Sequence, residues 1–189
     1  MTSERPKLVG WAHWTFGLMA QLTLVGAVAA QSAAVEQSCV AAESTLPLTR
    51  FNDNGDGTVT DVESKLMWMR CPSGQRWFNA GCTGQAATYN WGDALRQASQ
   101  VSSSGEAFFN DWRVPALRDL ATITDRGCKN PRTNLVLFPG TPPTAFWTST
   151  PRPGGKPEEL AFALSFGEEG VMAARKDERF YVRFVRNAM

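Results

Sequence analysis

Residues 50–71 read RFNDNGDGTVTDVESKLMWMRC, and this stretch carries the strongest structural signal in the chain. The turn cluster DNGDG separates LTRFN, residues 48–52, from TVTD, residues 58–61, and KLMWM follows at 65–69. Asn-Gly and Asp-Gly pairs between strand-like runs are typical of β-hairpins. The stretch therefore predicts short antiparallel strands joined by tight turns.

Working outward from this stretch, two helices and further strands are predicted. Residues 91–101 place apolar side chains at i, i+3, i+4 and i+7, which indicates an amphipathic helix. A second helix begins at Pro115, a residue suited to a first helical position, and runs to Thr124. Later runs predict strands: FWTST at 146–150, LAFALSF at 160–166, VMAAR at 171–175 and RFYVRFV at 179–185. The predicted fold class is α+β.

The N-terminus predicts export. Residues 1–30 combine a short basic region, an apolar run and small residues that suit a signal peptidase, so we expect a signal peptide there. The alternative is an uncleaved membrane anchor, although the apolar run is short for a span. Residues 31–47 predict an extended lead-in, and residues 48–189 a single binding domain. The expected location is the periplasm, the outer surface or the medium.

Charge and histidine content narrow the function. The chain has 19 basic and 18 acidic side chains, a net charge of +1, which gives no reason to expect nucleic-acid binding. Cleavage after Ala30 also removes His13, the only histidine. A chain without histidine has no imidazole general base and no histidine metal ligand, and no cofactor is expected.

The four cysteines, at positions 39, 71, 82 and 128, follow the expected signal peptide. An even number in an exported chain predicts disulfides, with three connectivities open. Cys71 and Cys82 bracket the Gly/Pro-containing loop CPSGQRWFNAGC, and their pairing would leave Cys39 with Cys128. A four-thiolate metal site would need two C-x-x-C pairs, which the sequence lacks.

The turn cluster also permits a calcium loop. With Gly57 at the sharp turn, the calcium ligands would include Asn52, Asn54, Asp56 and Glu63. The flanks predict strands rather than the helices of an EF-hand, so the hairpin interpretation is favoured and calcium is not.

Seven segments occur in a characteristic order: RFNDNGDGTVTDVESKLMWMRC, YNWGDALRQA, NDWRVPALRDL, CKNPRTN, FWTSTP, LAFALSFGEEGV and YVRFVR. Over residues 49–186 this order resembles the Legionella collagen-like protein C-terminal domain family. The resemblance implies a C-type-lectin-like fold on an exported bacterial protein, with adhesion and binding to sulfated polysaccharides. The chain lacks a collagen-like Gly-X-Y region, so homo-oligomerisation stays open.

DWRVP also resembles the formylglycine-generating enzymes, which use a related fold. Those enzymes need a reactive cysteine pair late in the domain, and this chain has no cysteine beyond Cys128. We therefore expect Trp112 to pack in the core, Arg113 to form a structural ion pair, and the protein to have no catalytic residue.

The basic C-terminal region supplies candidate ligand-binding residues: Arg175, Lys176, Arg179, Arg183 and Arg186, interleaved with Phe180 and Tyr181, of which Arg175, Lys176, Arg179 and Tyr181 are the favoured set. Basic side chains suit sulfate groups, although solvated charges on an edge strand are the simpler interpretation. The expected function is a non-enzymatic binding or adhesion module for a glycan or sulfated polysaccharide. The alternatives are a structural, protein-binding subunit of a surface assembly and an enzyme of the formylglycine-generating type. The expected partner is thus a glycan or a surface protein. The chain is expected to contact the membrane only transiently, through its signal peptide.

Overall fold

The computed structural model describes residues 2, 36–104, 109–154 and 159–188. The expected signal peptide at 1–30 lies outside the described residues, apart from residue 2. None of the helices in the described ranges is long and apolar enough to cross a membrane. Residues from Val35 onward cluster as one compact unit.

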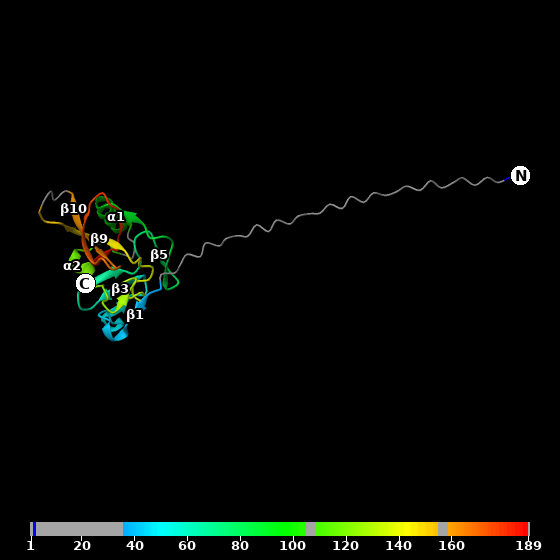
Figure 1. Cartoon of the computed structure of the whole chain (residues 1–189), viewed down its shortest axis with the longest axis horizontal. Coiled ribbons are helices and arrows are strands. Elements are labelled where there is room, and N and C mark those ends of the chain that lie inside the picture. The colour runs from blue at the N-terminus through cyan, green and yellow to red at the C-terminus, as the bar shows by residue number, and fades with distance from the viewer. Residues whose placement is uncertain (1, 3–35, 105–108, 155–158, 189) are drawn as a thin grey trace. The chain divides into compact units, whose positions relative to one another are not determined.

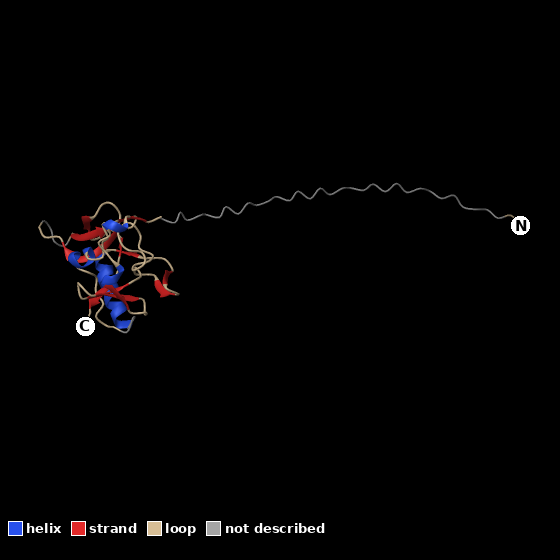
Figure 2. Cartoon of the chain, turned by 90° about the horizontal axis from the view of Figure 1, so that it is seen from below, coloured by secondary structure: helices blue, strands red, loops and turns tan. Residues whose placement is uncertain are grey.

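Short strands dominate the chain, and two α-helices lie between them in the described ranges (Figures 1 and 2). The helices are α1 (Trp91–Ser104) and α2 (Leu117–Ala121), and 3-10 turns occupy Ala41–Glu43 and Leu48–Arg50. The strands are β1 (Ser38–Cys39), β2 (Phe51–Asp53), β3 (Thr58–Asp61), β4 (Leu66–Met69), β5 (Arg76–Phe78), β6 (Gly81–Thr83), β7 (Thr88–Tyr89), β8 (Cys128–Lys129), β9 (Ala145–Pro151), β10 (Leu160–Ser165), β11 (Val171–Arg175), β12 (Phe180–Tyr181) and β13 (Val185–Asn187). The α+β prediction is confirmed.

The strands form two main sheets. One has the order β11-β10-β9-β12-β7 and the other β13-β4-β3-β2, with β1-β8 and β5-β6 as two-stranded pairs. Pairing is antiparallel apart from β12 with β9. In Figure 1, β9 and β10 lie on the same side of the unit as α1, while β3 and β1 lie on the opposite side.

The predicted hairpin is present. Strands β2 and β3 pair with Phe51 opposite Asp61 and Asp53 opposite Val59. The turn needs Gly57, whose φ is +91° and whose added Cβ would lie 2.6 Å from the Cβ of Trp77. A larger residue is therefore excluded by backbone strain and by the close approach of the β5–β6 hairpin.

Two apolar clusters stabilise the unit. The first contains Leu46, Phe51, Val59, Leu66, Trp68, Leu120, Ile123, Leu137, Phe138, Phe146, Leu164, Phe166 and Val185. The second contains Ala94, Ala98, Val101, Trp112, Val114, Ala145, Trp147, Ala161, Ala163, Ala174, Val182 and Phe184. Neighbours in β9, Phe146 and Trp147, belong to different clusters, because side chains alternate across a strand. The five-stranded sheet thus lies between the two clusters.

The single strand predicted over 179–185 is divided. Phe180–Tyr181 forms β12 in the five-stranded sheet, and Val185–Asn187 forms β13 in the four-stranded sheet. Phe180, Val182 and Phe184 do share one side, since all pack in the second cluster. Tyr181 and Val185 pack in the first cluster, so both sides of the segment are buried. A single strand would have kept residues 179–185 within one sheet. Instead, the segment connects the five-stranded sheet to the four-stranded sheet.

The second helix is shorter than predicted. It follows Pro115 but spans only Leu117–Ala121. Its start is fixed by two hydrogen bonds: Ala116 N donates to Asp119 Oδ2 (3.0 Å), and Leu117 N donates to Thr150 Oγ1 (2.9 Å). Thr122 Oγ1 donates back to the Asp119 carbonyl (2.7 Å), which competes with continuation of the helix.

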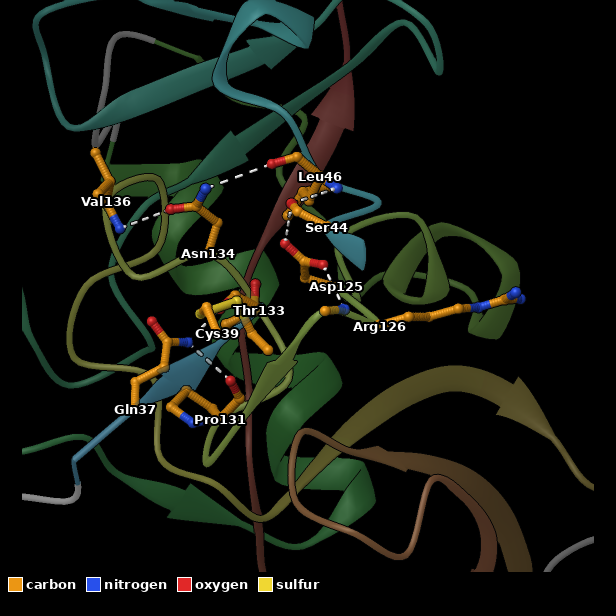
Figure 3. The surroundings of a disulfide bond; sticks show 12 residues. Gln37, Cys39, Ser44, Leu46, Asp125, Arg126, Pro131, Thr133, Asn134 and Val136 are labelled. Atoms are coloured by element: carbon orange, nitrogen blue, oxygen red, sulfur yellow. Dashed lines mark hydrogen bonds between the residues drawn. A yellow bond between two sulfur atoms is a disulfide. The ribbon is translucent and has the colours of Figure 1, made fainter. Parts of the chain in front are cut away.

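Both disulfides join the expected pairs, Cys71–Cys82 and Cys39–Cys128. Cys39 in β1 lies opposite Cys128 in β8, and Leu46 is fully buried, so residues 36–47 of the expected lead-in are part of the fold. Figure 3 shows the surroundings of Cys39: buried Asp125 accepts a hydrogen bond from Ser44 Oγ (2.7 Å), and Gln37 Nε2 donates to the Pro131 carbonyl (2.8 Å).

Candidate functional site

The predicted basic turn connects β11 and β12, and its first cation is paired within the turn. Arg175 Nε and Nη2 donate to the two carboxylate oxygens of Asp177, at 3.0 and 2.5 Å. Arg175 N also donates to Glu178 Oε1 (2.8 Å). The hydrogen bond from Arg175 holds the pKa of Asp177 below its ordinary value. The charge of Arg175 is therefore balanced locally.

Lys176 lies against helix α1. Its Nζ lies 4.3 Å from the centroid of the Trp91 ring, which is a cation–π arrangement. Trp91 N donates to the Lys176 carbonyl (2.9 Å), and Lys176 N donates to the Glu159 carbonyl (2.8 Å). These contacts fix the position of the lysine relative to the helix.

The four predicted ligand-binding residues are brought together only in part. Arg175 and Lys176 line one cavity of about 600 Å³, together with Asn90, Glu159, Leu160 and Asp177. Arg179 instead donates a hydrogen bond to the Thr88 carbonyl, and Tyr181 packs 5.6 Å from the Phe146 ring. Neither of these two lines the cavity. We call it the Arg175–Lys176 cavity.

Arg183 and Arg186 are not surface candidates. Arg183 is fully buried: it donates to the Met69 and Arg70 carbonyls and to Thr141 Oγ1 (2.6 Å), and its guanidinium lies 5.0 Å from the Phe138 ring centroid. Burial lowers the pKa of Arg183 to about 9, so the group remains protonated at neutral pH. Arg186 is 4% exposed and bonds Asp111 at 2.6 Å.

The calcium candidates occupy two ends of the hairpin. Asn54 and Asp56 are at the turn, where Asp56 Oδ1 accepts bonds from Thr58 N (2.9 Å) and Thr58 Oγ1 (2.6 Å). Asn52 lies in β2 opposite Thr60. Glu63 follows the other end of β3 and lies 3.3 Å from Arg50 Nε. The structure does not bring these four side chains together. Across the described ranges, no group of three or more acidic, cysteine or histidine side chains is placed to hold a metal.

The predictions for the WRVP segment are confirmed. Trp112 is 3% exposed within the second cluster. Arg113 Nη1 bonds Asp119 Oδ2 at 2.7 Å, the same carboxylate oxygen that caps helix α2. These residues position the helix, and all four cysteines are in disulfides.

A second cavity was not predicted from the sequence. It measures about 430 Å³ and is lined by Asp56, Gly57, Thr58, Met69, Cys71, Pro72, Ser73, Gly74, Gln75, Arg76, Trp77, Tyr89, Gln97, Val101 and Phe184. We call it the Trp77 cavity. The bracketing cysteines of CPSGQRWFNAGC indicated a closed loop, and an aromatic residue inside such a loop is the signal that could have drawn attention to it.

The fold is thus an α+β domain with mostly short antiparallel strands, two disulfides and surface cavities lined by polar and aromatic side chains. The model of the Lcl C-terminal domain matches residues 57–186. The chain therefore belongs to the Legionella collagen-like protein C-terminal domain family, as its ordered motifs predicted. No curated protein matches it.

Proposed function

We propose that the chain is an exported, non-enzymatic binding module with a C-type-lectin-like fold, which holds an anionic glycan at the Arg175–Lys176 cavity. Membership of the family supports the fold and the ligand class. The two disulfides support an oxidising compartment, because such bonds persist outside the cytosol.

The observation that carries the proposal is the composition of the Arg175–Lys176 cavity. Two cations, one amide and two carboxylates surround a space of about 600 Å³, within the range of about 300–1,000 Å³ that is typical of ligand sites. A sulfated or uronic sugar offers an anionic group to the cations and hydroxyls to Asn90 and Asp177. Since Asp177 already balances Arg175, single contacts are weak and are screened by salt over about 8 Å at physiological ionic strength. Useful affinity then depends on several copies of the domain.

Immobilised heparin tests this site. The triple variant Arg175→Ala, Lys176→Ala, Arg179→Ala removes the two cations of the cavity and the neighbouring surface cation Arg179, and it should elute at lower salt than the wild type. A matched control removes three exposed cations elsewhere, by Arg118→Ala, Arg126→Ala and Lys129→Ala, and should elute close to the wild type.

Two outcomes would contradict the proposal. Equal salt shifts in both triple variants would mean that retention reflects only overall charge. No retention of the wild type at low salt would favour the protein-binding alternative, which affinity purification from the native cell envelope would then address.

A further inference from the structure

The Trp77 cavity lies between three parts of the chain. Gly57 in the β2–β3 turn forms one wall, the disulfide-closed segment from Cys71 to Trp77 forms the second, and Gln97 of helix α1 belongs to the third. None of its lining residues lines the Arg175–Lys176 cavity. At about 430 Å³ it is in the size range of small-ligand sites.

Trp77 is held in place before any ligand arrives. The guanidinium of buried Arg70 lies 4.0 Å from the Trp77 ring centroid. Arg70 is itself fixed by hydrogen bonds to the Val136 (2.6 Å) and Leu137 (3.0 Å) carbonyls and by Asp53 (2.6 Å). A ring that is already immobilised loses little entropy when a ligand packs against it.

The backbone around the ring is equally constrained. Trp77 pairs with Cys82 across the β5–β6 hairpin, and Cys82 is bonded to Cys71. The missing side chain of Gly57 allows the β2–β3 turn to approach within van der Waals contact of Trp77. The tryptophan wall therefore has a defined position relative to the opposite wall.

Hydrogen-bonding groups line the cavity beside the ring, and two of them are unused within the described residues. The side chains of Arg76 and Gln97 make no hydrogen bond or ion pair to the described part of the chain, although both line the cavity. The hydroxyls of Ser73 and Tyr89 lie 3.1 Å apart, and Asp56 uses only Oδ1 in its bonds to Thr58. The cavity thus offers both donors and acceptors beside an aromatic wall.

The charges of the lining are balanced, since Asp56 is its only acidic member and Arg76 its only basic one. What sets this lining apart is its aromatic ring, since the Arg175–Lys176 cavity has two cations and no aromatic side chain in its lining. A ligand with an apolar face and several hydroxyls, but no net charge, matches the lining best.

We propose that the Trp77 cavity binds an uncharged saccharide ring, whose C–H face packs on Trp77 while its hydroxyls bond Gln97, Arg76 and the Ser73–Tyr89 hydroxyl pair. This site is separate from the anionic-glycan site proposed above and differs from it in ligand chemistry. A proline-rich peptide, which also packs on aromatic walls, is the competing occupant that the experiment separates.

The test titrates the disulfide-intact protein with uncharged tetrasaccharides of glucose, mannose and N-acetylglucosamine, and with a proline-rich peptide, using calorimetry and saturation-transfer NMR. We expect at least one tetrasaccharide to bind, and Trp77→Ala to weaken it about tenfold or more. Trp77→Phe should retain part of the affinity. Phe78→Ala is the matched control, because Phe78 is the next residue of the same hairpin, is 62% exposed and lines neither cavity.

Gln97→Ala provides a second variant that leaves the Arg70–Trp77 contact intact, and it should weaken binding about three- to tenfold. Heparin retention should be unchanged in both variants, so failure here is distinguishable from failure of the anionic-glycan proposal. The proposal is overturned if no tetrasaccharide binds, if the peptide binds and the saccharides do not, or if Gln97→Ala and the folded Trp77 variants bind as tightly as the wild type.

Discussion

Residues 175–179 and residues 183–186 have the same basic character in the sequence but opposite roles in the structure. The first segment is an exposed turn in which Asp177 neutralises Arg175. The second is buried, and within the described residues Arg183 bonds backbone carbonyls and a threonine hydroxyl and lies beside the Phe138 ring. In the sequence, an arginine at every third or fourth position suggests one continuous basic surface. In the structure, Arg175 and Arg179 are exposed, whereas Arg183 and Arg186 are buried and have structural roles.

The difference indicates which arginines contribute to the free energy of unfolding. An exposed ion pair contributes little to the free energy of unfolding, because water solvates both charges and salt screens them. A buried guanidinium has lost its water, so each remaining hydrogen bond becomes costly to remove. The buried arginines should therefore determine stability, while the exposed ones should influence only what the surface binds.

The largest effect is expected at Arg183. Arg183→Ala removes its hydrogen bonds and leaves a cavity against Phe138, so the free energy of unfolding should fall by about 3–5 kcal/mol. Denaturant unfolding with both disulfides intact measures this. Arg183→Met keeps most of the volume and should lose less, while exposed Arg179→Ala should leave stability unchanged. Equal stability of Arg183→Ala and Arg179→Ala would break the comparison.

A second effect concerns a partly buried arginine, Arg50, whose carboxylate partner is fully buried. That partner is Asp61. Burial alone would raise the pKa of Asp61, but hydrogen bonds from Arg50, Ser64 and the Glu63 and Ser64 amides outweigh burial and lower it. Asp61→Asn should cost about 3 kcal/mol at neutral pH, since it leaves Arg50 without its main partner.

The pH dependence of that effect has a defined sign. A lowered folded pKa stabilises the fold above the ordinary carboxyl value of 3.8 and loses this contribution as pH falls through the folded value. Wild-type stability should therefore decline below about pH 4, and Asp61→Asn should decline less over that range. Parallel acid profiles for the two proteins would contradict the assignment.

A smaller effect is expected where one partner is buried and the other is exposed. Arg186 is 5% exposed at its side chain and packs 3.8 Å from the Phe109 ring centroid, whereas Asp111 is 51% exposed. Asp111→Asn should cost less than about 1 kcal/mol. Arg186→Ala should cost about 2 kcal/mol, because the buried stem and the ring contact are also lost. Equal losses would mean that the ion pair, rather than packing, holds this site.

The smallest effect on stability is expected at Asp177. Asp177→Asn should leave thermal unfolding unchanged but release Arg175 from its intramolecular partner. Heparin elution should then move to higher salt. Glu168→Gln, which removes an exposed negative charge from another turn, is the control. A shift of the same size in the control would show that only net charge had changed.

Features that depend on neighbouring residues were predictable from the sequence, whereas features that depend on contacts between distant segments were not. The β2–β3 hairpin follows from turn dipeptides, and the pairing of Cys39 with Cys128 follows once Cys71 closes on Cys82. The WRVP assignments also held, because Trp112 is apolar and Arg113 has an acidic residue within the next helix.

The division of residues 179–185 depends on partners distant in sequence. Arg183 is buried because Phe138 and Thr141, which are distant in sequence, pack against its guanidinium. The pattern of residues within 179–185 does not indicate these contacts. The Trp77 cavity likewise requires Gly57 and Arg70 to converge on one ring. The residues of the alternative calcium interpretation, which the sequence did not favour, lie apart for a similar reason, since β3 separates Glu63 from the turn.

The pairing of β1 with β8 has a consequence for how shortened forms of the protein would behave. A chain begun at Gly57, the first residue matched by the family model, would lack Cys39, Leu46 and all of β2. Cys128 would then be a lone thiol, free to cross-link two molecules, and β3 would become an open sheet edge that invites pairing with a neighbour. Dimers of such a truncated protein would be artefacts of the cut, so quaternary structure is best measured on protein that begins before Cys39.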